Sequence, residues 1–413
     1  MKYIFFLLLL LPLQAKKSTR IKNDVCDSRC MGDKATAALN KKAFVPPATA
    51  ATVSNAVASD GQTAPSQNHL KVLTLLQKLQ RILQEKKDVA LPEFVPNRPL
   101  RPSDKDDNIP ALRQILQSLG YLEKATDSPF FDEELENAVK AFQAGHCLEV
   151  DGIIGDETKT KINWPYTKRL AMVGDSITKI QNLVFTDRTA IVNIPTYTMY
   201  VYDNQKLKMR MKVIVGKKKR PTPIMTSYID GIDFNPVWVV PNTILIEDHL
   251  PKIQQDPNFF ETSNIEVQDH DGNPVDPSDV EWDEVNVHDF PYVFKQKPGK
   301  KNALGLVKFN LQNFEAVYMH DTSQPELFRE SSRALSSGCI RLEKAGKFAC
   351  WLLNLEPDAV REIIDTGETE TKPLKNLVAV HITYLPVWIE EQQGDGKVLW
   401  GDDPYNIEPK PFY

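Results

Sequence analysis

A cysteine and a histidine in the C-terminal half carry the clearest catalytic chemistry in this sequence. Cys339 follows Ser-Ser-Gly, and His320 ends an apolar run typical of a strand. A thiolate is a strong nucleophile, and a nearby imidazole can generate it. Gly338 permits a sharp turn that aims the sulfur into a cleft, where free backbone amides would face the charge formed on an attacked carbonyl. These residue types suit thiol-based covalent catalysis, although a cysteine and a histidine 19 positions apart are not a motif by themselves.

A buried structural cysteine beside a hydrogen-bonded core histidine is the alternative interpretation, because free cysteine commonly packs as a small hydrophobe. The chain has five cysteines, so at least one thiol is unpaired if the protein is exported. Cys26 and Cys30 are one helical turn apart and can be bridged, whereas Cys147 and Cys350 lie in apolar surroundings. Cys339 is the natural candidate for the unpaired thiol.

Strands and short helices must position the cysteine and the histidine. From residue 189 onward, β-branched and aromatic residues dominate short segments bounded by turn residues, and residues 378–385 supply a final strand. A helix is predicted over residues 344–355, directly after the cysteine. We therefore predict a β-rich catalytic domain over residues 189–385.

Residues 243–302 interrupt this pattern with six prolines and an acidic run. The composition predicts a long irregular insertion that acts as a lid over the cleft, and a surface excursion without a role is the alternative. Residues 269–273 resemble a calcium loop only faintly, because the sixth-position glycine and the bidentate glutamate are missing. Zinc-ligand spacing and a phosphate loop are also absent from the sequence, so we expect neither metal nor cofactor.

Helical periodicity precedes the strands. Apolar residues recur at helical spacing within residues 69–104, which end in a proline-rich linker, and again within residues 165–188. We expect these two segments to pack together as a scaffold. Residues 105–164, between them, are predicted to form three short helices, and residues 386–413 are predicted to be a C-terminal tail.

The N-terminus has the pattern of an export signal. A lysine at position 2, an apolar run and a small residue at position 15 predict a signal peptide over residues 1–15. The run is too short to span a bilayer, but an uncleaved membrane tether is the alternative because Leu13 is not a small residue. Residues 16–68, rich in Ala, Ser, Thr and Lys, are predicted to be a disordered spacer.

The overall composition is that of a globular protein with two or three domains. Of the 413 residues, 41% are apolar and 25% are charged. The net charge of −5 lacks the basic footprint of a nucleic-acid-binding protein, so we expect no nucleic acid partner.

Several blocks around the cysteine resemble the L,D-transpeptidase family, whose catalytic domain is of the YkuD type. In order along the chain they are Val215-Gly216 with Arg220-Pro221-Thr222-Pro223, Phe234 to Pro241, Pro298-Gly299 with Asn302 to Gly305, Val307-Lys308-Phe309, Tyr318 to Thr322, and Ala334 to Arg341. Ser323 and Gln312 stand where the family often has proline. These two differences affect loops rather than the cysteine or the histidine.

The resemblance assigns roles by position. It makes Cys339 the nucleophile and His320 its general base, whose imidazolium would stabilise the thiolate. Tyr318 would join the amides of Gly338 and Cys339 around the oxyanion, and a core tyrosine is the alternative for that residue. Ser337 would orient the imidazole through its carbonyl.

Substrate binding is implied for three further residues, Arg341, Trp238 and Asn313. Arg341 would hold a carboxylate of the anionic stem peptide, and a structural salt bridge is the alternative for this arginine.

Residues 105–164 resemble the three-helix peptidoglycan-binding domain. The matching residues are Ala138-Val139, Phe142-Gln143 and Asp151 to Thr158. A helical spacer without a ligand is the alternative. We therefore predict an α+β multidomain protein in the periplasm, monomeric and associated with the cell wall, in which a helical scaffold and this small domain accompany the β-rich catalytic domain.

The implied reaction transfers an acyl group from a tetrapeptide stem to Cys339 with release of D-Ala, and then to the amine of a neighbouring stem. The product is a 3–3 cross-link of the kind made in peptidoglycan biosynthesis. The alternatives are an L,D-carboxypeptidase, a transferase that uses a protein amine, and a non-catalytic peptidoglycan-binding protein. The resemblance also implies that carbapenems acylate Cys339.

Overall fold

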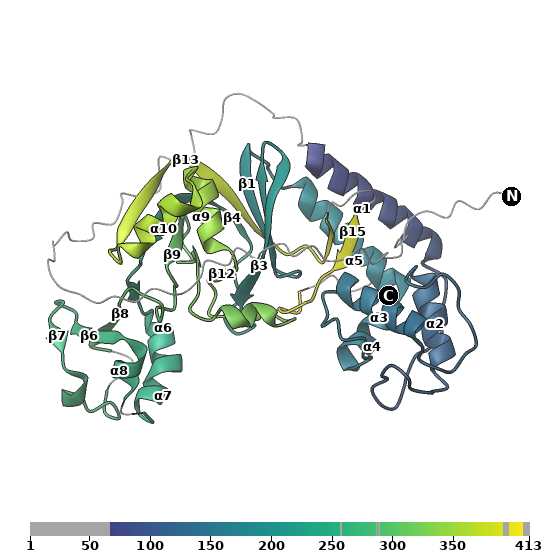
Figure 1. Cartoon of the computed structure of the whole chain (residues 1–413), viewed down its shortest axis with the longest axis horizontal. Helices are drawn as coiled ribbons and strands as arrows, with labels where there is room; N and C mark the ends of the chain where they lie inside the picture. The colour runs from purple at the N-terminus through teal and green to yellow at the C-terminus, as the bar shows by residue number, and fades with distance from the viewer. Residues whose placement is uncertain (1–66, 257, 286, 288–289, 391–395, 408–413) are drawn as a thin grey trace. The chain divides into compact units, whose positions relative to one another are not determined.

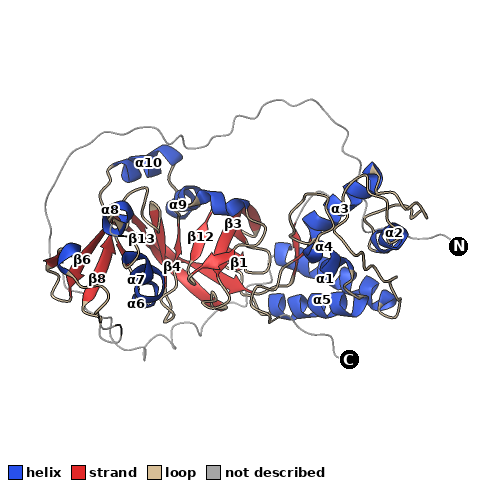
Figure 2. Ribbon diagram, turned by 90° about the horizontal axis from the view of Figure 1, so that it is seen from below, coloured by secondary structure: helices blue, strands red, loops and turns tan. Residues whose placement is uncertain are grey.

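The computed structural model describes residues 67–413 except 257, 286, 288–289, 391–395 and 408–413. The predicted signal peptide, nearly all of the predicted spacer, and Cys26 and Cys30 lie outside the described residues. Within them, the chain is helical up to residue 181 and rich in strands from residue 188 onward (Figures 1 and 2). The predicted α+β class is confirmed. None of the described helices is both long and apolar enough to cross a membrane.

Two helices distant in sequence pack against each other in the N-terminal part. They are α1 (Gln67–Lys86) and α5 (Tyr166–Gln181), and both also contact β14 (Val387–Glu390). Between them in sequence lie α2 (Ile109–Ser118), α3 (Glu133–Gly145) and α4 (Asp156–Ile162). The apolar faces of all five helices join one hydrophobic core, which also takes in two buried side chains of the proline-rich linker, Phe94 and Leu100.

A buried glutamine fixes the turn that leads into α4. Gln143 donates from Nε2 to Asp151 Oδ1 at 2.7 Å and to the Ile153 carbonyl at 3.0 Å. Its Oε1 accepts the Gly152 N–H at 2.9 Å. Gly152 has φ +78°, a conformation that favours glycine. One side chain therefore satisfies several buried polar groups and holds α3 and α4 in a fixed relation.

The strands of the catalytic part form a nine-stranded sheet in the order β11-β3-β12-β10-β9-β4-β13-β1-β2. Their bounds are β1 (Arg188–Asn193), β2 (Thr198–Asp203), β3 (Lys206–Gly216), β4 (Met225–Phe234), β9 (Val307–Leu311), β10 (Met319–His320), β11 (Ala334–Ser336), β12 (Ile340–Leu342) and β13 (Glu370–Thr383). β3 pairs with β2 along most of its length and with β12 and β11 at its end. The sheet therefore closes on itself like a barrel.

Two helices, α9 (Ala345–Leu353) and α10 (Pro357–Asp365), lie against this sheet (Figure 2). Phe348 of α9 is fully buried, and its ring lies 5.0 Å from that of Phe309 on β9. A short 3-10 helix, η3 (Pro325–Arg329), lies between β10 and β11. The core between helices and sheet fixes the strands that carry the candidate residues.

Two short strands lie within the predicted C-terminal tail. They form the two-stranded sheet of β14 (Val387–Glu390) and β15 (Lys397–Trp400), whose apolar side chains are buried against the helices. The Trp388 ring stacks on Tyr200 of β2 at 4.9 Å. Large apolar side chains in both strands supply the buried area that holds so short a hairpin in place.

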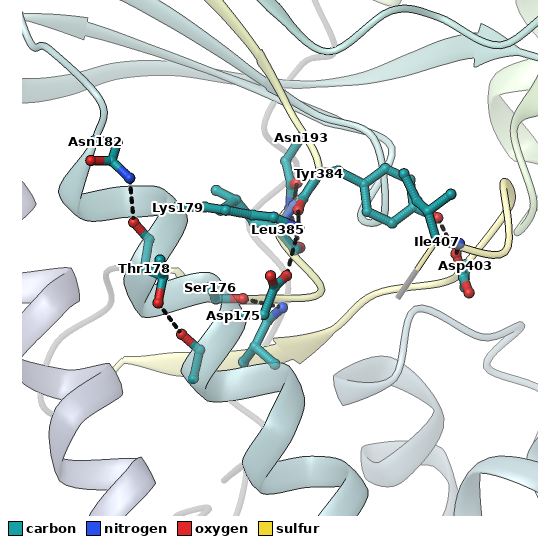
Figure 3. A network of polar contacts seen from close by, with 12 residues as sticks. Asp175, Ser176, Thr178, Lys179, Asn182, Asn193, Tyr384, Leu385, Asp403 and Ile407 are labelled. Atoms are coloured by element: carbon teal, nitrogen blue, oxygen red, sulfur yellow. Dashed lines mark hydrogen bonds and ion pairs between the residues drawn. The ribbon is translucent and has the colours of Figure 1, made fainter. Parts of the chain in front are cut away.

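Figure 3 shows how α5 is attached to the chain that follows β13. Lys179 Nζ donates to the Tyr384 carbonyl at 2.9 Å and to Asp175 at 2.6 Å. Ser176 Oγ accepts the Val387 N–H at 2.9 Å. These partners satisfy buried polar groups where β14 begins, so the helix fixes the path of the chain from β13 to β14.

The sequence predicts that the insertion (residues 243–302) is irregular. In the structure it instead has its own sheet and core. Its helical elements are α6 (Asn242–Ile244), η1 (Leu245–His249), α7 (Leu250–Ile253), α8 (Phe259–Ser263) and η2 (Pro277–Asp279), and its strands are β6 (Ile265–Asp269), β7 (Pro274–Val275) and β8 (Tyr292–Gln296). β8 also pairs with β5 (Trp238–Val239) outside the insertion.

Aromatic packing explains why the insertion folds without a clear period. The Phe260 ring lies 5.2 Å from Trp282 and 5.5 Å from Phe294. A few aromatic side chains bury enough area to form a small core, although prolines break the regular pattern. Asp269, in the segment weighed as a calcium loop, instead accepts from the backbone and side chain of Asn273 and closes the β6–β7 turn.

A histidine is buried where the helical core meets β15. His146 stacks on the Phe142 ring at 3.8 Å and lies 6.0 Å from the Trp400 ring. Its Nδ1 bonds to the Phe142 carbonyl at 2.8 Å, and Nε2 faces Arg169 Nη1 at 2.9 Å. Since a guanidinium only donates, Nε2 must accept and the ring is neutral. Burial, and then the positive charge of Arg169, hold the pKa of His146 well below its usual 6.5.

This arrangement predicts acid sensitivity that can be traced to one residue. Below pH 6.5 the unfolded chain binds a proton at position 146 that the folded chain does not, so the free energy of unfolding falls as the pH falls. The slope due to one such histidine is about 1.4 kcal/mol per pH unit. His146→Gln keeps an acceptor for Arg169 and removes the titration. Urea unfolding between neutral and mildly acidic pH should show a shallower loss of stability in the variant, and equal slopes would contradict the assignment.

Candidate active site

The register of three strands places the candidate side chains on one face of the sheet. β10 pairs in parallel with β12, with Met319 opposite Ile340 and His320 opposite Arg341. Met319 and Ile340 are fully buried in the core under α9. Because side chains alternate along a strand, Tyr318, His320 and Arg341 point to the opposite face.

Cys339 lies just before β12, beside Tyr318. The Ile340 N–H donates to the Tyr318 carbonyl at 3.1 Å, which continues the pairing by one residue. The Tyr318 hydroxyl and backbone both lie within hydrogen-bond reach of the sulfur. His320 is a diagonal neighbour of Cys339 across the same pair of strands. The structure therefore brings the candidate nucleophile, the candidate base and the tyrosine to one place.

The turn before the nucleophile is held by hydroxyl groups. Gly338 has φ +119° and is buried. Its carbonyl accepts from Thr222 Oγ1 at 2.7 Å, and Ser336 Oγ donates to the Cys339 carbonyl at 2.6 Å. The Gly338 N–H donates to Ser336 Oγ at 3.2 Å. The sequence predicts that this amide is free to bind an oxyanion, but in the structure it is already engaged. The Cys339 N–H, in contrast, has no partner among the described residues.

Burial holds both the thiol and the imidazole in their neutral forms. It raises the pKa of Cys339, and hydrogen bonds from Tyr318 and the charges of Lys308 and Arg341 lower it by less. Burial and then the charge of Arg341 lower the pKa of His320 to about 3. Burial therefore disfavours the predicted pair of imidazolium and resting thiolate, because desolvation penalises the charged form of each group.

The imidazole contacts the backbone of two residues outside the nucleophile turn. Hydrogen bonds to the backbone of Asp321 and Leu304 act on the pKa of His320. Its Nδ1 is buried and has no well-formed hydrogen bond within the described chain. The predicted orienter, Ser337, instead accepts from Arg220 Nη1 at 2.9 Å through its hydroxyl. A role for the Ser337 carbonyl stays a prediction.

Arg341 is a largely buried cation that forms no ion pair with any described residue. Its Nη1 donates to Gln324 Oε1 at 3.1 Å, and its Nε is buried without a partner in the described chain. A structural salt bridge, the alternative weighed from the sequence, is not what holds it. A buried guanidinium with an unused donor suits an anionic ligand.

Tyr318 and Trp238 connect the site to the insertion. Trp238 lies in the insertion's core, and Tyr318 packs against that core. Burial, and then the neighbouring Cys339, raise the pKa of Tyr318, so its hydroxyl stays protonated and can donate. Trp238 Nε1 is buried and makes no well-formed hydrogen bond among the described residues, but it lies close enough to the Tyr318 hydroxyl to act on the pKa of Tyr318.

Asn313 fastens its own loop. Its Nδ2 donates to the carbonyls of Leu311 and Val317 at 2.9 and 2.7 Å, and its Oδ1 accepts the Val317 N–H at 3.0 Å. Both ends of the amide are engaged in the turn between β9 and β10. The geometry therefore gives Asn313 a structural role and no contact to offer a substrate.

Sequence reasoning missed three residues that hold the nucleophile turn: Arg220, Thr222 and Ser336. Thr222 and Arg220 belong to the Arg-Pro-Thr-Pro block, yet their spacing gives no sign that they reach residues 337 and 338. A cavity of about 320 Å³ lies elsewhere, lined in part by Lys161, Trp164 and Ser331, and includes none of the candidate residues.

Comparison with known families agrees with this geometry. Residues 187–381 match the YkuD model, described as the L,D-transpeptidase catalytic domain. The chain carries an L,D-transpeptidase catalytic domain. Residues 105–162 match the model named "Putative peptidoglycan binding domain", so a peptidoglycan-binding domain precedes the L,D-transpeptidase domain.

Individual relatives cover parts of the chain. A "Putative L,D-transpeptidase" of Haemophilus influenzae is 35% identical over 227 residues, which is 54% of this chain and 45% of the relative. A "Probable CtpA-like serine protease" of Staphylococcus aureus is 34% identical over 91 residues, 22% of this chain and 18% of the relative. The chain thus spans less than half the length of these curated relatives. A solved L,D-transpeptidase from Stackebrandtia nassauensis shares 12% identity, with 69% of this chain and 97% of that chain covered at a TM-score of 0.26.

The neutral thiol and imidazole predict how the cysteine of the L,D-transpeptidase domain reacts with a neutral alkylating reagent. The rate at which iodoacetamide alkylates Cys339 can be measured by peptide mapping. It should be low near pH 6 and rise only through alkaline pH, because the pKa of the thiol is raised. Cys339→Ala identifies the modified peptide. A high rate that is already constant near pH 6 would instead reveal a resting thiolate–imidazolium pair.

Proposed function

We propose that this protein is an L,D-transpeptidase that forms 3–3 cross-links in peptidoglycan through an acyl-enzyme on Cys339. The observation that carries the proposal is the face of the sheet shared by Cys339, Tyr318, His320 and Arg341. It combines a nucleophile, a hydroxyl donor, a neutral base and an unpaired cation. Family membership supports cross-linking chemistry, and this arrangement supports the cysteine as the residue that performs it.

The first half-reaction forms a thioester. Cys339 Sγ attacks the carbonyl carbon of the third residue of a tetrapeptide stem while His320 takes the thiol proton. The Cys339 N–H and the Tyr318 hydroxyl donate to the oxyanion that forms. When the C–N bond breaks, the imidazolium returns the proton to the leaving amine of D-Ala. The low pKa of His320, about 3, makes the imidazolium a strong acid for this step.

The second half-reaction makes the cross-link. The amine of a neighbouring stem's diamino acid attacks the thioester carbonyl and loses a proton to His320. The C–S bond breaks, the sulfur regains a proton from the imidazolium, and a new amide joins the two stems. Splitting one amide exchange into two steps is the general advantage of covalent catalysis.

Arg341 and Trp238 supply the substrate-binding side of the proposal. The unused Nε–H of Arg341 is available to a stem-peptide carboxylate next to the nucleophile. The indole N–H of Trp238 is a second buried donor, which makes no well-formed hydrogen bond in the described residues although the Tyr318 hydroxyl lies near it. A peptide that satisfies both donors would gain affinity because each is already desolvated.

The insertion is proposed to act as the wall of the cleft. Tyr318 packs on its core, so the insertion covers the hydroxyl that faces the sulfur. Excluding water there would protect the thioester from hydrolysis and favour the amine acceptor. The peptidoglycan-binding domain would hold the protein, which we propose acts as a monomer in the periplasm, on the cell wall.

Purified tetrapeptide muropeptides test this function. We expect loss of D-Ala together with dimers in the mass spectrum, and no product from Cys339→Ala, which removes only the nucleophilic sulfur. Cys350→Ala is the matched control, because that cysteine lies on α9 and faces the core rather than the cleft. It should keep turnover and alter stability alone.

The outcomes separate the candidate functions. Loss of D-Ala without dimers would make the protein an L,D-carboxypeptidase with water as the acceptor. Binding of muropeptides without any mass change would make it a non-catalytic peptidoglycan-binding protein. Turnover by Cys339→Ala at the wild-type rate would contradict the proposed nucleophile.

A further inference from the structure

One guanidinium group contacts both the insertion and the nucleophile turn. Arg220 Nη1 lies 2.9 Å from Ser337 Oγ and 2.6 Å from Asp248 Oδ2. Its Nη2 also pairs with Glu247 and lies 3.4 Å from Asp248 Oδ1. Ser337 is two residues before Cys339, and Asp248 is in η1 of the insertion. Lys217, three residues earlier, reaches the same two segments less directly: its N–H donates to the Ser336 carbonyl at 2.8 Å, and its Nζ lies 3.8 Å from Asp248 Oδ1.

The backbone around Arg220 is held without its side chain. The Lys217 N–H donates to the Ser336 carbonyl at 2.8 Å, and the Arg220 N–H donates to the Lys217 carbonyl at 2.8 Å. Thr222 bonds to Gly338, and its N–H donates to the Tyr405 hydroxyl at 3.0 Å. The turn is therefore already fixed beside the nucleophile, and the guanidinium is not needed to form it.

The side chain nevertheless occupies a sheltered position. It is only 12% exposed, compared with 31% for Asp248. Ion pairs that are partly shielded from water are screened less by salt than fully exposed ones. The desolvation cost of a partly buried cation has to be offset by its polar partners. Because one rigid planar group makes the contacts to both Asp248 and Ser337, these two contacts are coupled.

The helix that presents Asp248 has a reason to be fixed in one orientation. It is a π-helical turn between α6 and α7, followed by Pro251, which has no N–H to complete a regular helical bond. Leu245 and His249 on this turn face the insertion's core, with the His249 ring 5.9 Å from Trp238. The same turn therefore carries apolar contacts inward and two carboxylates outward to Arg220.

From these contacts we infer that Arg220 is a positioning residue that couples the insertion to the nucleophile. With the contact to Asp248 formed, the guanidinium is oriented to hold Ser337, and the cleft wall and the nucleophile turn are fixed together. When the guanidinium is removed, the Ser337 hydroxyl loses its donor and the insertion loses its ion pairs to Arg220, which leaves the 3.8 Å contact of Lys217 Nζ to Asp248. The inference rests on Cys339 as the proposed nucleophile.

The test is the rate at which iodoacetamide, a neutral reagent, modifies Cys339 at fixed pH and at low and high salt. Arg220→Gln should change this rate about tenfold, the size expected for losing a charge-assisted contact. Asp248→Asn, which keeps the shape of the insertion, should change it in the same direction. The double variant should change the rate by less than the product of the two single fold-changes, because both replacements break the Arg220–Asp248 contact, while each also breaks a contact of its own, Arg220 to Glu247 and Asp248 to Lys217.

Salt dependence and a rescue distinguish positioning from a general structural effect. High salt should move the wild-type rate toward that of Arg220→Gln and change the rates of the variants less, because each variant keeps only one ion pair at this contact, Lys217–Asp248 or Arg220–Glu247. Arg220→Lys should bring the alkylation rate only part of the way back to the wild-type value, because an ammonium cannot bridge Asp248 and Ser337 as the planar guanidinium does. Lys297→Gln is the control, since it removes an exposed ion pair to Glu266 inside the insertion.

Wild-type rates and salt dependence in both Arg220→Gln and Asp248→Asn, each with unchanged circular dichroism, would overturn the inference. Because alkylation does not require peptidoglycan chemistry, the result is independent of whether muropeptides are cross-linked. If Cys339 is alkylated as expected but the protein turns over no muropeptide, the proposed function is contradicted, whereas the inference that Arg220 couples the insertion to Cys339 still holds.

Discussion

The parallel pairing of β10 with β12 is the constraint on which the candidate site depends. It sets His320 opposite Arg341 and places Cys339 beside Tyr318, so all four side chains share one face. A shift of one residue in this register would turn Met319 and Ile340 into the cleft and bury the reactive groups. The core under α9 prevents that shift, because both apolar side chains are fully buried there. The hydrophobic core of the domain thus fixes the chemistry on the opposite face.

Burial on that reactive face has an electrostatic consequence. It raises the pKa of the thiol and lowers that of the imidazole, so the resting site carries its charge on Arg341 and Lys308. In the proposed mechanism, proton transfer from sulfur to His320 therefore accompanies attack on the substrate. The two cations favour the developing thiolate and oxyanion, while the protonated Tyr318 hydroxyl remains a donor. An anionic peptide bound at Arg341 would change this balance, and substrate binding and nucleophile activation are therefore linked in this account.

The fold was predictable where the pattern is local, and less so where contacts are distant. The apolar run that ends at His320 indicated a strand, and the α+β class followed from the change of periodicity near residue 189. The insertion was mistaken for an irregular segment because Phe260, Trp282 and Phe294 form a core without a period. The hairpin of β14 and β15 was missed since it is too short to show alternation. Residue identity alone does not show whether a polar side chain bonds locally or to a distant segment. Asn313 closes its own loop, while Arg220 reaches a residue 117 positions away. The charge state of Cys339 and His320 also required knowledge of burial.

Intact-mass spectrometry with a carbapenem tests the central claim, that Cys339 is an acyl-accepting nucleophile in this site, most directly. The strained β-lactam carbonyl presents the same kind of electrophile to the sulfur as a stem peptide, and its opening leaves a covalent ester of the thiol. The account predicts one adduct per chain, located on Cys339 by peptide mapping, absent from Cys339→Ala and strongly slowed in His320→Gln. An adduct on Cys147 or Cys350, or none on the folded wild-type protein, would contradict it.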